Sequence, residues 1–231
     1  MTLLDATGEA FRLLFGGDPE LWGIVLISIK VAVFGLLLAV LPGIALGYVL
    51  AMKRFPGRRV LVVTMQSLLA FPTVVVGLVL YMLLSRHGPA GSLALLFTQD
   101  AMILGQAILA FPILVAYTIS AVQGADPRVH ETAVCLGAGW LRAALTTLNE
   151  TRFAVTAGVI NGFGRAISEV GCALMIGGNI AGVTRNITTA IALETSKGEF
   201  AQGIALGMVL VVLALGVNIA LAVMQGEGGM K

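Results

Sequence analysis

The sequence predicts an all-α membrane protein of one domain, residues 1–231, that crosses the bilayer five times. Three observations carry this prediction: 58% of the residues are hydrophobic, only 11% are charged, and five apolar runs are long enough to span a membrane. Soluble domains carry about 25% charged residues, so this composition excludes an ordinary soluble enzyme. The net charge of +2 is too small to indicate a nucleic-acid partner, and membrane lipid is the expected surrounding.

The first span is predicted at 21–52. Asp18 is the expected N-cap and Pro19 the first helical residue, a combination that favours the start of a helix. The run is longer than the roughly 20 residues a bilayer requires, so we expect it to tilt. The preceding segment, residues 1–18, has apolar residues at helical spacing and is predicted to be a helix on the membrane surface.

Four further spans follow, at 60–84, 101–123, 153–176 and 202–224. Three prolines fall inside the spans: Pro42, Pro72 and Pro112. A helix bundle tolerates such prolines because neighbouring groups can satisfy the freed carbonyls. We also expect close helix packing at six glycines, namely Gly47, Gly77, Gly158, Gly162, Gly207 and Gly216.

The positions of lysine and arginine predict the orientation, because cytoplasmic loops are enriched in these residues. One side carries eight of them: Lys53, Arg54, Arg58, Arg59, Arg128, Arg142, Arg152 and Lys231. The other side carries four: Arg12, Arg86, Arg185 and Lys197. The side with eight is predicted to be cytoplasmic, so the N-terminus lies outside the cell and the C-terminus inside.

The longest cytoplasmic segment, 124–152, is predicted to be helical and to start at Asp126 and Pro127. Its apolar stripe consists of Val129, Ala133, Leu136 and Trp140. Two interpretations fit this pattern. The helix either rests on the membrane surface or inserts into a groove on a soluble partner.

A short motif in this segment resembles a known family. Glu131, Thr132 and Ala133 are followed, after three residues, by Gly137. This resembles the "EAA, three residues, G" loop of permease subunits of ATP-binding-cassette importers, and it precedes the second-last span as in that family. Two departures are visible, since Thr132 replaces an alanine and the downstream proline motif is absent from 147–150.

The following span and outer segment extend the resemblance. Residues 164–171, 177–179 and 184–191 resemble the oxyanion branch of these permeases, and 194–198 most resembles the tungstate importers. Molybdate and sulfate permeases are similar too. The three substrates are tetrahedral dianions, and no residue in the sequence distinguishes among them.

The resemblance implies a type I importer permease of the inner (plasma) membrane. Two copies of the chain line the pathway, two cytoplasmic ATP-binding subunits hold the coupling segment, and an extracytoplasmic protein delivers the oxyanion. The implied coupling residues are Glu131, Thr132, Ala133, Gly137 and Trp140. No cofactor is expected on this chain, because ATP and magnesium bind to the ATPase subunits. The chain is not expected to be an enzyme, and it has no phosphate-binding GxxxxGK[ST] loop.

Two charges are predicted to lie inside the fourth span. Arg165 and Glu169 are four residues apart and therefore face the same side of a helix. A charge near the bilayer centre costs about 2.5 kcal/mol or more, so such residues face the bundle interior or water. They form an internal ion pair, or Arg165 and Ser168 line the oxyanion path while Glu169 limits the strength of anion binding.

The outer segment, 177–200, is too polar to span, and a short re-entrant or surface helix is expected within 184–193. It forms a capping loop, or its polar residues contact the binding protein or close an outer gate. The residues concerned are Asn179, Arg185, Thr188 and Thr189.

Two other classes of function remain as alternatives. A stand-alone anion channel or secondary transporter would explain the charges in the membrane but not the motif at Glu131–Gly137. An intramembrane enzyme is disfavoured because Ser168 and Glu169 are adjacent and point to different helix faces. No metal site is expected, since His87 and His130 have no second ligand at a suitable spacing, and Cys135 and Cys172 are expected to be free thiols.

Overall fold

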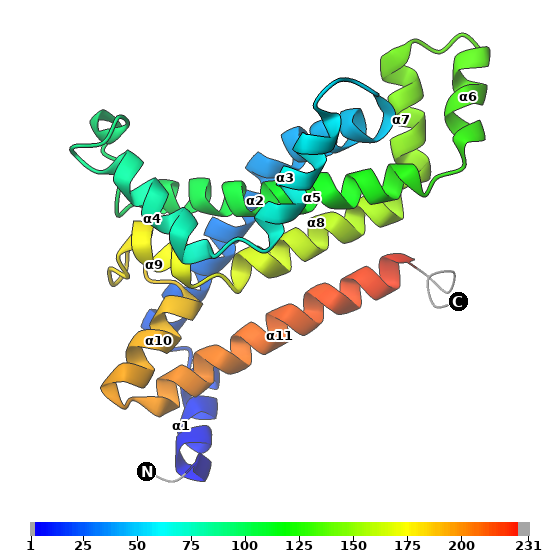
Figure 1. Ribbon diagram of the computed structural model, residues 1–231. Coiled ribbons are helices and arrows are strands. Elements are labelled where there is room, and N and C mark those ends of the chain that lie inside the picture. The colour runs from blue at the N-terminus through cyan, green and yellow to red at the C-terminus, as the bar shows by residue number, and fades with distance from the viewer. Residues whose placement is uncertain (1–2, 226–231) are drawn as a thin grey trace.

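The computed structural model describes residues 3–225, which are helical and contain no strand (Figure 1). The helices are α1 (Leu3–Phe15), α2 (Pro19–Met52), α3 (Arg58–Leu69), α4 (Thr73–Leu84), η1 (Gly91–Leu93), α5 (Gln99–Gln123), α6 (Pro127–Cys135), α7 (Trp140–Glu150), α8 (Arg152–Ile167), α9 (Gly171–Gly177), α10 (Ile187–Lys197) and α11 (Phe200–Gln225). The predicted all-α class is confirmed. Lys231 lies outside the described residues.

Three helices are each long and apolar enough to cross a membrane: α2, α5 and the Phe200–Ile219 part of α11. Two helix pairs pass the same test together but are bent, α3 with α4 by 104° and α8 with α9 by 57°. The described chain therefore has three spans, or up to five if each bent pair counts as one.

The interpretation of 60–84 as one helix was wrong. The chain stops being helical at Ala70, and Pro72 is the N-cap of α4 with an extended ψ of 118°. Proline has no N–H to continue the ladder, and it disfavours a helical conformation at the preceding residue, Phe71. Pro42 and Pro112, by contrast, lie inside α2 and α5 without ending them.

The predicted span 153–176 is also interrupted, between Ile167 and Gly171. Two side chains supply alternative hydrogen bonds there. Ser168 Oγ donates to the carbonyl of Gly164 at 2.8 Å, and Glu169 Oε1 accepts from the N–H of Cys172 at 3.0 Å. Side chains that bond to nearby backbone compete with the helix ladder, and Glu169 thereby satisfies an N–H at the start of α9.

Helix α2 begins as predicted. The Asp18 carboxylate accepts from the N–H groups of Glu20 and Leu21, at 2.8 and 3.2 Å, and Pro19 is the first helical residue. Helix α1 forms within the predicted surface segment, and its position relative to a membrane stays a prediction.

Helices α2 and α5 form the most extensive helix pair, and glycines on α2 bring the two backbones together. A Cβ atom added at Gly35, Gly43 or Gly47 would lie 2.5 to 2.8 Å from a Cβ atom of α5. Gly77, Gly158 and Gly162 are packed against neighbouring helices in the same way, so the prediction is confirmed at four of the six glycines. Within the described chain it was wrong for Gly207 and Gly216, where an added Cβ would meet no neighbouring atom within 4 Å.

Helices α6 and α7 form a hairpin that projects beyond the ends of α5 and α8, as Figure 1 shows at the upper right. Helices α9 and α10 lie at the opposite end of the bundle. The projecting α6–α7 hairpin and the segment with α9 and α10 therefore lie at opposite ends of the bundle.

The close contact between α2 and α5 can be tested with two alanine substitutions. In Gly47→Ala, the new Cβ would lie 2.6 Å from the Thr118 Cβ, so we expect a loss of about 1–3 kcal/mol of stability from overpacking. The matched control, Gly207→Ala, adds a methyl group where no neighbour is within 4 Å and should be neutral or slightly stabilising. Thermal unfolding in detergent measures both, and an equal loss in the two variants would contradict the packing described.

Candidate functional site

The turn at the tip of the α6–α7 hairpin is built around Gly137. This glycine has φ +83°, the left-handed conformation that favours glycine. Its N–H donates to the carbonyl of Val134 at 2.9 Å, and the next N–H, of Ala138, donates to that of Ala133 at 3.0 Å. These two bonds are the Schellman arrangement that ends a helix. The spacing between Ala133 and Gly137 therefore determines where α6 stops.

The start of α6 is set by Asp126, whose side chain accepts from the N–H of Arg128 at 2.9 Å. Glu131 and Thr132 are exposed, whereas Ala133 is buried against α7. A groove of about 600 Å³ lies between the two helices. It is lined by Arg128, Val129, Thr132, Ala133, Leu136, Ala138, Arg142 and Thr146. The hairpin thus presents an apolar groove flanked by two cationic side chains.

The hairpin also contacts the end of α2, through Tyr48. The Tyr48 and Trp140 rings meet edge to face with centroids 6.2 Å apart, and the Lys53 ammonium lies 5.1 Å from the Trp140 ring centroid. The Tyr48 hydroxyl lies 3.4 Å from His130 Nδ1, which is also 3.4 Å from the Thr147 hydroxyl. Trp140 therefore packs against a transmembrane helix, although half of its surface is exposed.

At the bend between α8 and α9, Arg165 and Glu169 form the predicted ion pair. Arg165 Nη1 lies 3.1 Å from Glu169 Oε2, and their side chains are 40% and 2% exposed. The hydroxyl of Thr188 donates to the Glu169 carbonyl at 2.6 Å, which attaches α10 to the same bend. The carboxylate is fully inside the chain, while part of the guanidinium faces outward.

Helix α8 has a continuous face of small and polar residues that the rest of the chain leaves partly or fully exposed. Its members, spaced three or four residues apart, are Ala154, Ala157, Asn161, Arg165 and Ser168. Asn161 Nδ2 donates to the Ala157 carbonyl at 2.8 Å. On α11, Asn218 Nδ2 likewise donates to a carbonyl of its own helix, that of Ala214, at 2.8 Å. Each amide thus binds a backbone carbonyl four residues earlier in its helix.

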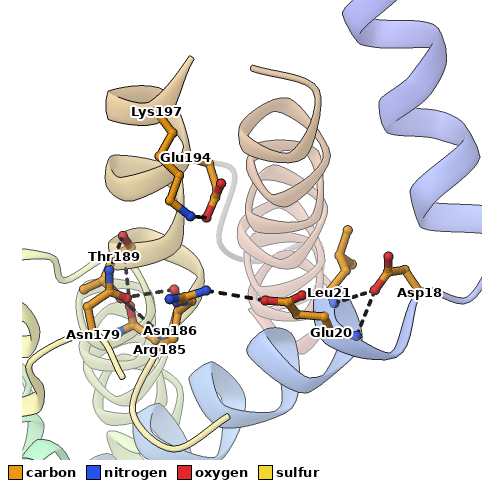
Figure 2. A network of polar contacts seen from close by, with 9 residues as sticks. All are labelled: Asp18, Glu20, Leu21, Asn179, Arg185, Asn186, Thr189, Glu194 and Lys197. Carbon is orange, nitrogen blue, oxygen red and sulfur yellow. Dashed lines mark hydrogen bonds and ion pairs between the residues drawn. The ribbon is translucent and has the colours of Figure 1, made fainter. Parts of the chain in front are cut away.

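The polar residues of the outer segment gather around the start of α10 (Figure 2). Asn186 is the N-cap, and its carboxamide oxygen accepts from the N–H and hydroxyl of Thr189 at 2.9 and 2.8 Å. Asn179, at φ +53°, donates to the carbonyl of Thr189 at 3.3 Å. Thr188 and Thr189 are therefore buried and bound within the chain. Their role at an outer gate or a binding-protein contact stays a prediction.

Three contacts attach this segment to the rest of the bundle. Arg185 Nη1 lies 3.4 Å from Glu20 Oε1, as Figure 2 shows. The N–H of Ile187 donates to the Ser28 hydroxyl on α2 at 2.7 Å. Gln99 accepts from the Lys30 ammonium and donates to the carbonyl of Val183, both at 2.7 Å. The first turn of α10, residues 187–190, is therefore buried against the bundle, whereas residues 180–183 and 195–200 of the same segment are exposed.

The sequence did not identify Tyr48, Lys53, His130 or Thr147 as parts of a site. Tyr48 and His130 are 82 positions apart, so no local spacing relates them. In residues 3–225, no group of three or more His, Cys, Asp or Glu side chains is placed to hold a metal ion. Cys135 and Cys172 are free thiols, as predicted.

Known proteins resemble this chain over most of its length. It is 40% identical over 216 residues to the tungstate uptake system permease protein TupB of Campylobacter jejuni, covering 94% of this chain and 90% of that protein. The corresponding TupB of Peptoclostridium acidaminophilum is 36% identical over 218 residues, 94% of this chain and 96% of that protein. A probable anion ABC transporter permease protein of Haloferax volcanii is 40% identical over 200 residues, covering 84% and 86%.

Residues 43–225 match the family described as the binding-protein-dependent transport system inner membrane component. The match includes the α6–α7 hairpin, the bend at Glu169 and α11. The chain belongs to this family and is therefore a multi-pass permease component of the inner membrane.

Proposed function

We propose that this chain is the permease subunit of an ATP-driven importer for a tetrahedral oxyanion, with tungstate as its substrate. The observation that carries the proposal is the similarity to two permeases named for tungstate uptake, which extends over 94% of the chain. Permeases named for molybdenum and sulfate transport are also related, at 32% and 27% identity, so molybdate and sulfate are the alternative substrates.

The proposed topology has five spans, with each bent helix pair crossing once, the N-terminus outside and the C-terminus inside. The eight cations assigned to the cytoplasmic side support this orientation. The α6–α7 hairpin would then project into the cytoplasm, and α10 would lie at the outer end.

The proposed assembly contains two copies of the chain, two ATP-binding subunits and an extracytoplasmic binding protein. No residue of α3 is buried within the chain, and the face of α8 with Asn161, Arg165 and Ser168 is open. Polar groups avoid hydrocarbon, so a second copy and a water-filled path between the copies are a suitable cover for this face.

The α6–α7 hairpin is the proposed contact with the ATP-binding subunit. Its exposed residues Glu131 and Thr132 and the open groove beside them are available to a partner. The contacts of Trp140 and His130 with Tyr48 would carry hairpin movement into α2, in addition to α5 and α8, to which the hairpin is joined by the chain. Alternating access then follows from a movement of packed helices.

Loss of the hairpin contact tests the importer proposal against a stand-alone channel. We expect Glu131→Ala together with Gly137→Val to prevent recovery of an ATPase subunit in a pull-down and to lower ATP-dependent oxyanion uptake about tenfold or more, because valine is strained at positive φ. Glu150→Ala, which removes an exposed acid from α7, is the control. A chain that moves oxyanions in liposomes without ATP or a partner would instead support a channel.

The contact with α2 is tested by Tyr48→Phe, which removes only the hydroxyl. The ATPase subunit should still bind, while the rate of oxyanion uptake falls about two- to tenfold. This factor corresponds to the loss of one hydrogen bond, which contributes roughly 0.5–1.5 kcal/mol. The control is Tyr117→Phe on α5, because the Tyr117 side chain packs against Gly158 of α8. Uptake by Tyr48→Phe at the rate of the unsubstituted protein would mean that α2 receives no movement through this contact.

Substitutions at the ion pair separate its two interpretations. Glu169→Gln keeps an oxygen to accept from Cys172 but leaves Arg165 without a counter-charge, so we expect a loss of about 1.5–3 kcal/mol of stability. The double variant Arg165→Gln with Glu169→Gln should recover stability. Oxyanion uptake by the double variant then distinguishes the two interpretations. Recovered uptake indicates a purely structural ion pair, and uptake that stays low indicates that Arg165 lines the path.

A further inference from the structure

A crevice of about 300 Å³, lined by both polar and apolar side chains, lies between α8 and α11. It is lined by Ile160, Asn161, Gly164, Arg165, Ile167, Ser168, Ala214, Val217 and Asn218. The polar side chains come from both helices, and no acidic side chain is part of the lining. At roughly 30 Å³ per water, the crevice has room for a small anion together with several waters.

The two amides in this crevice have unused hydrogen-bonding groups. Asn161 Nδ2 and Asn218 Nδ2 each donate to a carbonyl of their own helix at 2.8 Å. The second N–H of each amide has no partner among the described residues, and both side chains are exposed. An exposed amide within a membrane span is costly against hydrocarbon, so these groups need water or a polar ligand.

Arg165 supplies a cation with spare donors. One of its nitrogens, Nη1, is 3.1 Å from Glu169 Oε2, and the guanidinium has no other hydrogen-bond partner within residues 3–225. A guanidinium carries five N–H donors in a planar fork that suits oxyanions. Glu169 balances the charge from the buried side, which keeps the attraction for a dianion moderate, as passage through a conduit requires.

We propose that the α8–α11 crevice is a transit site for a tetrahedral oxyanion, in which Arg165 binds the charge and the amides of Asn161 and Asn218 donate hydrogen bonds. The proposal rests on the proposed importer function and names α11 as part of the path. Because the donors sit on two helices, a change in the spacing of α8 and α11 would release the anion.

Cysteine substitutions test whether the crevice is wet and takes an oxyanion. Asn161→Cys, Asn218→Cys and Val212→Cys are prepared in the full permease with its ATPase subunits and treated with an anionic methanethiosulfonate reagent. Val212 is 67% exposed and lies about 120° around α11 from Asn218, so it reports on the apolar exposed face. Peptide mass spectrometry follows each cysteine separately, including the exposed native Cys135.

We expect the cysteines at 161 and 218 to react about tenfold or more faster than that at 212, because only a hydrated thiol forms the reactive thiolate. Tungstate should slow both reactions, and sodium chloride at equal ionic strength should not. Slow reaction at 218, or fast reaction that tungstate, molybdate and sulfate all leave unchanged, would overturn the transit site.

Uptake by substituted complexes separates this site from the importer proposal. We expect Asn218→Leu to lower the maximal rate of ATP-dependent oxyanion uptake about tenfold, because the binding protein sets the oxyanion concentration for half-maximal uptake, whereas Asn218→Gln, which keeps the amide, retains most of the rate. Unchanged uptake in Asn218→Leu would overturn the site alone. An unsubstituted complex that imports no tetrahedral oxyanion would overturn the proposed function itself.

Discussion

The side chain of Glu169 is buried within the helices, and its two carboxylate oxygens and its backbone carbonyl are bound by three different helices. One carboxylate oxygen accepts from Arg165 on α8, the other from the first turn of α9, and the carbonyl accepts from Thr188 on α10. A break in a membrane helix exposes backbone groups that lipid cannot satisfy. Glu169 and its partners satisfy several of these groups at one bend, so the direction of α9 and the position of α10 both depend on this residue.

A second constraint is the close pairing of α2 with α5. Cβ atoms at Gly35, Gly43 and Gly47 would clash with α5, so these glycines allow the two backbones to pack as one unit. Ser28 of α2 binds the start of α10, and Tyr48 of the same helix contacts the α6–α7 hairpin. A single helix thus connects the two ends of the bundle. Because close-packed interiors resist small deformations, the α2–α5 pair is suited to move as one unit in the proposed transport cycle.

Local signals in the sequence predicted the features that depend on neighbours in the chain. Asp18 with Pro19 and Asp126 with Pro127 mark helix starts because a cap acts within three residues, and Arg165 meets Glu169 because residues four apart share a helix face.

The features that the sequence missed depend on contacts between distant segments. Pro42, Pro72 and Pro112 are chemically the same, yet only Pro72 stands at a bend of 104°. Tertiary packing decides the outcome, since Gly77 of α4 packs against the backbone of Cys172 while α3 packs against α5. The exposed polar face of α8 also depends on contacts that no local sequence pattern shows. Asn161 and Arg165 are at least partly exposed among residues 3–225, and polar groups are costly against hydrocarbon, which favours the second copy proposed above as their cover. In the proposed assembly, this face of α8 borders the water-filled path between the two copies of the chain.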